Sequence, residues 1–235
     1  MRTEDILKIA KAKGLNNKGF IEKDYYQDKI LYSLFSRTNN IVFKGGTALY
    51  KLYNLPRFSE DLDFGIIGKV NLKRLIKSAA RELKFSIKRT YFSKKSALFK
   101  LSFEGFLTGY NTIRIDFSKL KVYTYETVDY VPRYIDIPPF VLNVMSKKEM
   151  IAEKIHSIFH RTSARDLYDL FFLLRMEPAD KRLILKKVPN FTLKKFKERI
   201  EKLKPLWDPE LKPFVLERIP YETAKNFCIS NIAVI

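Results

Sequence analysis

The chain has 235 residues and a formal net charge of +19, from 45 Lys and Arg against 26 Asp and Glu. This length can bury a sizeable core, as one large domain or two small ones. No run of about 18 apolar residues occurs, which excludes a transmembrane helix, and one cysteine, Cys228, excludes an internal disulfide. The charged, amphipathic N-terminus lacks a signal-peptide core, so we expect a cytoplasmic protein with no membrane partner.

The positive charge favours a polyanionic partner, RNA or DNA, although a lysine-rich or thermophilic proteome would give the same excess. The C-terminal region is rich in such charge, with 12 Lys and Arg against 5 Asp and Glu between Lys181 and Arg218. Aromatic residues are interleaved there: Phe191, Phe196 and Trp207. The region is either a surface for single-stranded nucleic acid or an ordinary helix pair with its aromatics in the core.

The N-terminal half contains both apolar residues at helical spacing and the apolar patterns of strands. Apolar residues at helical spacing predict helices over residues 3–13, 18–37 and 71–84. Alternating or continuous apolar runs predict strands over residues 41–44, 61–67, 85–92, 97–103 and 112–117. Gly45 and Gly46 form a turn, and a short helix over 47–53 ends before Pro56. The irregular segment 121–143 is expected to hold one or two further strands.

From Ser146 the pattern is helical, with helices predicted over residues 147–160, 164–175, 179–187 and 192–203. Ser146 with Glu149, and Ser163 with Asp166, fit the capping box that starts a helix. Four prolines interrupt the stretch from 205 to 220, so no regular element is predicted there. The fold class is therefore α+β, with a mixed domain over residues 1–145 and a helical domain over 146–235.

Two aspartates in an apolar setting are the first sign of chemistry. On a strand, Asp61 and Asp63 project from one face, and Leu62 and Phe64 from the other. Adjacent carboxylates repel unless a cation lies between them, and Mg²⁺ is a hard ion that takes oxygen ligands. Asp116, on the alternating strand TIRIDFS, is the candidate third carboxylate; alone it would be read as an exposed strand residue.

The glycine pair before this strand suits phosphate binding. Gly45 and Gly46 let the backbone approach phosphate oxygens, and the helix opened by Thr47 offers free N–H groups. A plain strand-to-helix turn is the alternative reading. Three nearby side chains could meet a triphosphate or orient a carboxylate: Lys44, Arg57 and Ser59.

Residues 44–64, KGGTALYKLYNLPRFSEDLDF, resemble the first motif of the abortive-infection nucleotidyltransferase toxins (AbiEii/AbiGii type) of the DNA polymerase β-like superfamily. The superfamily signature is Gly-Gly or Gly-Ser, about a dozen residues, then Asp-x-Asp. Here 14 residues separate Gly46 from Asp61, which is long for the superfamily but matches this family. Residues 153–174, EKIHSIFHRTSARDLYDLFFLL, are similar to the family's later motif, a lysine on a helix followed by Arg-Asp-x-x-Asp-Leu.

The resemblance implies a polymerase β-like mixed-sheet core with flanking helices and a helical C-terminal half. It implies that Mg²⁺, or Mn²⁺, and an NTP are bound. The roles it implies are phosphate binding by Gly45, Gly46 and Ser59, metal binding by Asp61 and Asp63, and a third metal ligand or base at Asp116. Lys154 would contact the triphosphate, and Asp166 would lie in or beside the catalytic cleft.

The residues of the later motif also have structural interpretations that need no catalytic role. Lys154 borders the apolar face of its helix, from which its ammonium could reach solvent. Asp166 could cap its helix with Ser163, and Asp169 could pair with Arg161 or Arg165.

The predicted function is magnesium-dependent transfer of NMP from an NTP to an acceptor hydroxyl, with RNA or tRNA as the acceptor. The enzyme would then be the toxin of a toxin–antitoxin pair, with a cognate antitoxin as partner. Two alternatives keep the same fold: NMPylation of a protein or small molecule, and a slow NTP- or RNA-binding module. The nucleotide, the acceptor and the oligomeric state stay open.

Overall fold

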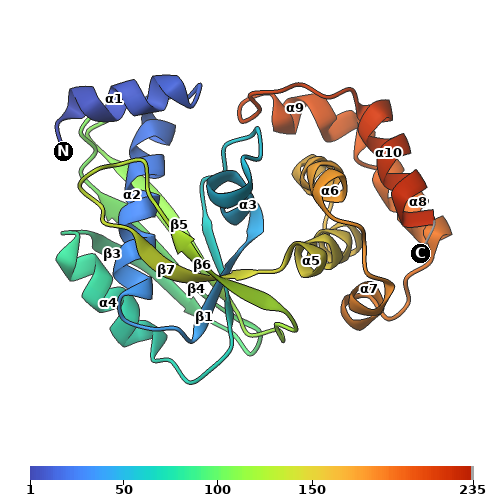
Figure 1. The fold of residues 1–235 in the computed structure, drawn as a ribbon, viewed down its shortest axis with the longest axis horizontal. Helices are drawn as coiled ribbons and strands as arrows, with labels where there is room; N and C mark the ends of the chain where they lie inside the picture. The colour runs from blue at the N-terminus through green and yellow to red at the C-terminus, as the bar shows by residue number, and fades with distance from the viewer. Residues whose placement is uncertain (234–235) are drawn as a thin grey trace. The chain divides into compact units, whose positions relative to one another are not determined.

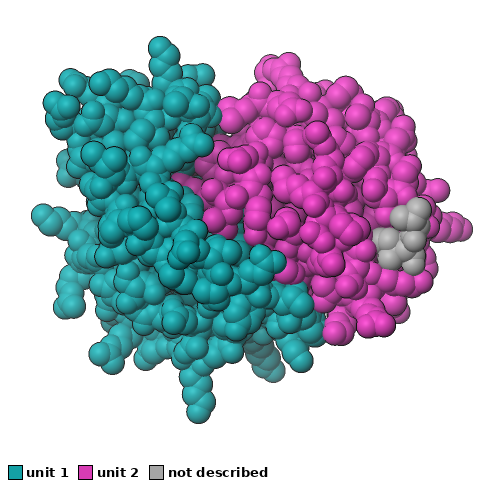
Figure 2. All heavy atoms as spheres, in the orientation of Figure 1, with its two compact units in different colours: residues 1–48, 59–144 teal, residues 49–58, 145–235 magenta. Residues whose placement is uncertain are grey.

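The computed structural model describes residues 1–233. The chain divides into two compact units, which Figure 2 colours separately. The first unit is Met1–Ala48 with Ser59–Val144, and the second is Leu49–Phe58 with Met145–Ile235. None of the described helices is long and apolar enough to cross a membrane.

A short segment of the N-terminal half, residues 49–58, is part of the second unit. The backbone explains why, because residues 56–58 run beside residues 214–216. The Phe58 N–H donates to the Phe214 carbonyl at 2.8 Å, and the Leu216 N–H donates to the Pro56 carbonyl at 2.8 Å.

The first unit is built on a mixed sheet (Figure 1). The strand order in the described chain is β3-β4-β5-β2-β1-β7-β6. Strand β2 pairs antiparallel with β1 and parallel with β5, while β4 is antiparallel to both β3 and β5. The strands are β1 Ile41–Lys44, β2 Leu62–Ile66, β3 Ser86–Phe92, β4 Ser96–Phe103, β5 Asn111–Ser118, β6 Tyr125–Tyr130 and β7 Phe140–Met145.

Alternation along the central strands gives the sheet two chemically different faces. On β5, Ile115 and Phe117 are fully buried, whereas Asp116 between them projects to the other side. Phe64 of β2 stacks on Phe117 with ring centroids 5.2 Å apart and lies 6.2 Å from the Phe35 ring. We refer to the side of Phe64 and Phe117 as the helix face and to the opposite side as the carboxylate face.

Three helices lie wholly within the first unit: α1 Thr3–Ala12, α2 Lys18–Phe35 and α4 Leu72–Glu82. Helix α2 supplies Phe35 and so packs on the helix face. Helix α4 lies against α2, where the Ser33 hydroxyl donates to the Glu82 carboxylate at 2.6 Å. Helix α3, Gly45–Tyr53, begins at the glycine pair itself, two residues before the predicted start.

The second unit is helical (Figure 1). Ser146 caps its first helix by accepting from the Glu149 N–H at 3.2 Å, as predicted. The final helix forms after the prolines, where no element was predicted, because Tyr221 and Cys228 are buried in this unit. The elements are α5 Lys147–His160, α6 Ala164–Met176, α7 Lys181–Lys187, α8 Leu193–Glu201, η1 Lys204–Leu206, α9 Trp207–Leu211 and α10 Tyr221–Ala233.

One prediction for this unit is wrong, and the choice between two alternatives is decided. Ser163 does not cap α6 through a capping box; its hydroxyl and the Ala164 N–H both donate to Glu210 at 2.9 Å. Phe196 and Trp207 are 0% and 4% exposed, so they are core residues rather than members of a basic aromatic surface. Long-range packing decides both cases, which spacing along the chain does not show.

Candidate active site

The three predicted carboxylates come together on the carboxylate face of the first unit. Asp63 of β2 is the register partner of Asp116 on β5, and Asp61 comes directly before β2. Directly opposed residues of paired strands project to the same side. Leu62 and Phe64 anchor β2 on the helix face, so Asp63 between them must point the other way.

Arg114 bridges two of these carboxylates, a contact that the sequence analysis missed. Its Nη2 lies 2.9 Å from Asp61 Oδ2, and its Nε lies 2.7 Å from Asp116 Oδ2. The signal was present in the strand, because Arg114 is two residues before Asp116 and therefore shares its face. The guanidinium supplies the positive charge that a pair of adjacent carboxylates needs.

Two of the carboxylates, Asp61 and Asp116, have raised pKa values. Burial raises the pKa of Asp61 to about 6, with the negative charges of Asp63, Glu60 and Asp116 adding to the rise and Arg114 opposing it. Burial also raises the pKa of Asp116, where Arg114 again opposes the effect. Such clustering of negative charge favours the binding of a cation.

The donor chemistry of this cluster fits Mg²⁺, since each side chain offers carboxylate oxygens to a hard ion. Within residues 1–233, no group of three or more His, Cys, Asp or Glu side chains is already arranged as a ligand set. The positive charge beside Asp61 and Asp116 is that of Arg114. A bound metal ion would therefore take over a neutralising role that the guanidinium now fills.

The glycine pair lies directly against the carboxylates. Gly45 has φ of +77°, a conformation that other residues rarely adopt, and a Cβ there would collide with the Asp63 side chain. The Thr47 hydroxyl donates to the Asp61 carbonyl, which ties the first turn of α3 to the start of β2. Lys44 is the register partner of Asp63 on β1. The start of α3 thus presents its backbone N–H groups beside the aspartates.

Gln27 holds the chain segment that leads into the aspartates. Its side-chain Nε2 donates to the carbonyls of Ser59 at 2.8 Å and Glu60 at 3.1 Å. Gln27 is fully buried on α2, one helical turn before the apolar pair Ile30 and Leu31. A polar residue on the apolar side of a predicted helix was the available signal for this positioning role.

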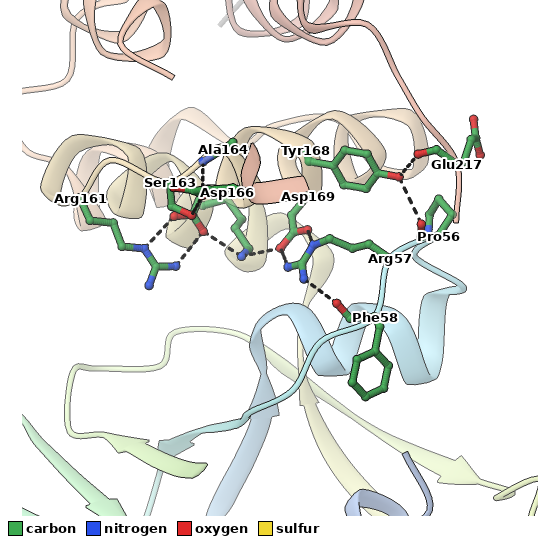
Figure 3. Close-up of polar contacts among 12 residues, drawn as sticks. Pro56, Arg57, Phe58, Arg161, Ser163, Ala164, Asp166, Tyr168, Asp169 and Glu217 are labelled. Atoms are coloured by element: carbon green, nitrogen blue, oxygen red, sulfur yellow. Dashed lines mark hydrogen bonds and ion pairs between the residues drawn. The ribbon is translucent and has the colours of Figure 1, made fainter. Parts of the chain in front are cut away.

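The second unit carries an ion-pair network, buried except at Arg161, that contains the other predicted site residues (Figure 3). Arg57 binds Asp169 in bidentate fashion, with Nε–Oδ1 at 2.6 Å and Nη2–Oδ2 at 2.7 Å. Lys154 Nζ lies 2.6 Å from Asp169 and 3.0 Å from Asp166. Arg161 completes the network with two contacts to Asp166, at 2.7 and 2.8 Å.

The structure therefore places the predicted site residues in two groups. The first unit holds the carboxylates and the phosphate-binding candidates Lys44, Gly45, Gly46, Thr47, Ser59, Asp61, Asp63 and Asp116. The second unit holds Arg57, Lys154 and Asp166, which lie together in the ion-pair network. Asp166 does not cap its helix, and Asp169 pairs with Arg57 and Lys154 rather than Arg165. The catalytic roles assigned to these residues stay predictions.

The network makes the stability of the protein depend on pH. Burial would raise the pKa of Asp166, but Lys154 and Arg161 lower it to about 2, below the unfolded value of about 3.9. The stabilisation is thus complete above about pH 5 and is lost as the pH falls toward 2. We expect Asp166→Asn to be about 2 kcal/mol less stable than the wild type at pH 7, with the gap closing by pH 2. Urea unfolding across this range tests it, and a gap independent of pH would contradict it.

Comparisons with known proteins give a family and a fold. The family model described as nucleotidyl transferase AbiEii toxin, type IV toxin–antitoxin system, matches residues 29–228. MenT4, a nucleotidyltransferase toxin from Mycobacterium tuberculosis H37Rv, has a TM-score of 0.68 at 18% identity, covering 97% of this chain and 88% of that one. JHP933 from Helicobacter pylori has a TM-score of 0.63 at 21% identity, covering 92% of this chain and 90% of that one. No curated protein matches by sequence.

Proposed function

The chain belongs to the AbiEii family of nucleotidyl transferase toxins, and on this basis we propose that it transfers NMP from an NTP to a hydroxyl of an RNA acceptor. The reaction would require a divalent metal ion, Mg²⁺ or Mn²⁺, and would release pyrophosphate. A cognate antitoxin protein is the partner that a type IV toxin–antitoxin system implies.

One observation supports the proposal above the others: Asp63 and Asp116 are in register on neighbouring strands, and Gly45 packs against Asp63. Phosphoryl and nucleotidyl transfer need little covalent chemistry from the protein. They need the phosphates and the acceptor to be held in line, and the charge on the transferring group to be neutralised. A phosphate-binding backbone turn beside a carboxylate cluster meets both needs.

The residues divide this work between them. Asp61, Asp63 and Asp116 would hold the metal ion, which supplies charge neutralisation at the transferring phosphate when bound. The backbone N–H groups of Gly45 and Gly46 would bind phosphate oxygens, with Thr47, Ser59 and Lys44 beside them. Asp116, next to the place where an acceptor would approach, would take the proton of the attacking hydroxyl.

Lys154 and Arg57 are proposed to bind the triphosphate. Lys154 is 8% exposed and Arg57 is 4% exposed, and both are already paired with Asp169. Burial alone would lower the pKa of Lys154, yet Asp169 and Asp166 raise it, so its ammonium stays charged. A permanently charged, preorganised lysine suits phosphate binding.

The test is incubation of the protein with total RNA, Mg²⁺ and each α-³²P-labelled NTP in turn, beside an Asp61→Ala, Asp63→Ala double variant. Label in RNA that depends on both aspartates and disappears with EDTA is the expected result, and it names the nucleotide and the acceptor. Label in protein instead of RNA would turn the proposal to NMPylation. No transfer to RNA, protein or small molecules would favour a slow nucleotide-binding module.

A further inference from the structure

The carboxylate face of the sheet carries a row of three cations, two of which have no role in the site described above. In the β3–β4 register Arg89 lies opposite Lys100, and in the β4–β5 register Lys100 lies opposite Arg114. Directly opposed residues share a face, so the three side chains stand in one line on the side of the aspartates. All three are exposed. We call Arg89, Lys100 and Arg114 the cationic row.

The cationic row destabilises the sheet when no partner is bound. Like charges directly opposite one another in a sheet destabilise it. Arg114 is neutralised by Asp61 and Asp116, but within the described residues Arg89 and Lys100 make no ion pair. The segment from Ser86 to Phe103, which forms the β3–β4 hairpin, contains five Lys and Arg and no Asp or Glu. A polyanion laid along the row would remove the repulsion.

An aromatic side chain stands beside the row. Tyr91 is the register partner of Leu98, and Leu98 is the register partner of Asp116, so Tyr91 projects from the same face. It is 54% exposed. An exposed ring next to a line of cations is the combination that binds single-stranded nucleic acid, with the cations on phosphates and the ring under a base.

The order of the strands decides which phosphates the row meets. Because the order is β3-β4-β5-β2-β1, the aspartates on β2 and β5 lie between the glycine turn after β1 and the cations on β4 and β3. The glycine turn serves the triphosphate in the proposed function. The cationic row extends away from the glycine turn for about 10 Å, or two strand spacings, toward the far edge of the sheet. In-line transfer needs acceptor and leaving group on opposite sides of the transferring phosphate, and this arrangement provides both sides.

We propose that the carboxylate face of β3, β4 and β5 is the docking track for the acceptor RNA. Arg89 and Lys100 bind the phosphodiester backbone of a single-stranded end, Tyr91 stacks on a base, and the terminal hydroxyl is delivered to the aspartates. This inference rests on the proposed function for the identity of the acceptor. It rests on the register, exposure and charge of these residues for its location.

Binding without turnover tests the location. The probe is a 5′-fluorescein-labelled single-stranded oligo(U) RNA. Its binding is measured by fluorescence anisotropy at several salt concentrations without NTP. We expect Arg89→Gln, Lys100→Gln to weaken binding by roughly 10-fold or more and to lower the slope of log K against log salt by about 1.4, or 0.7 per phosphate contact. Tyr91→Ala should weaken binding roughly 10-fold with the slope unchanged, and Tyr91→Phe should restore it.

Helix α4 supplies the matched control. Arg74→Gln, Lys77→Gln removes two exposed cations from the same unit, but on the helix that packs with α2 on the helix face. Exposed substitutions of this kind usually change stability by less than about 0.5 kcal/mol, which thermal melting of each variant checks. We expect the α4 variant to bind with the wild-type slope. An equal loss from the α4 variant, or wild-type binding by the Arg89, Lys100 variant, would overturn the docking track.

The two proposals fail in different ways. If the wild type binds RNA through the row but never labels it, the row stands as the RNA-binding surface, and RNA as the acceptor is wrong. If the wild type labels RNA, and the Arg89→Gln, Lys100→Gln protein binds and labels it equally well, the function stands and the track is wrong. A wild type that does not bind the probe overturns the track, whatever its activity on protein or small-molecule acceptors.

Discussion

Asp63→Asn is expected to lower nucleotidyl transfer by about 10³-fold or more while leaving the protein folded. A metal ion stabilises the developing charge of such a reaction by several kcal/mol, and each 1.36 kcal/mol corresponds to a factor of 10 in rate. Asparagine keeps the shape of the side chain but removes the negative charge that would hold the ion. Asp63 is the natural choice because it lies between Gly45 and Asp116.

Stability should respond in the opposite direction to activity. Without metal, Asp63 adds negative charge beside Asp61 and Asp116 and raises the pKa of both groups, after the larger effect of burial. Removing that charge relieves the repulsion, so metal-free Asp63→Asn should be at least as stable as the wild type. Loss of activity with no loss of stability is typical of a residue kept for function.

Thermal unfolding with and without Mg²⁺ checks this prediction beside the transfer assay. A ligand that binds only the folded state raises the melting temperature, and we expect that rise in the wild type but not in Asp63→Asn. Asp129→Asn, the same change at an exposed position on β6, is the matched control and should behave as the wild type. Transfer at the wild-type rate by Asp63→Asn would contradict the site, and an equal Mg²⁺ shift in both proteins would place the metal elsewhere.

Local patterns predicted much of the fold and the core of the candidate site. The alternation in TIRIDFS gives β5 its two faces, and the spacing of Asp61 and Asp63 gives them one face in common. Ser146 begins its helix as its capping pattern indicates. In each case the deciding interactions lie within a few residues, which a single sequence shows directly.

Partners that come from far along the chain could not be predicted. Arg57 and Asp169 are 112 positions apart, so no spacing rule joins them, and the sequence analysis did not predict their pairing. Ser163 and Ala164 are bound by Glu210, more than 40 positions away, and the capping pattern at Ser163 was misleading. The cationic row was likewise hidden, because it depends on which residues of β3, β4 and β5 are opposite one another.

Asp169→Ala is expected to destabilise the protein by about 3–5 kcal/mol, the cost of breaking a buried ion pair by removing one partner. Asp169 is fully buried, and two cations depend on it, Arg57 through two contacts and Lys154 through one. Burial would raise the pKa of Asp169, yet Arg57 and Lys154 hold it below its usual value. Alanine leaves the Arg57 charge buried without its carboxylate.

Urea unfolding at pH 7 measures the loss, with Asp208→Ala, the same change at an exposed position on α9, as the control expected to cost under about 1 kcal/mol. A second variant separates the buried charge from the lost packing. Arg57→Met, Asp169→Leu removes both charges and leaves Lys154 with Asp166, so it should be more stable than Asp169→Ala. If the double variant is the less stable one, the Arg57–Asp169 pair contributes net stability itself. If both variants are as stable as the wild type, the network serves only to position Lys154 and Arg57. Its loss must then lower the transfer activity.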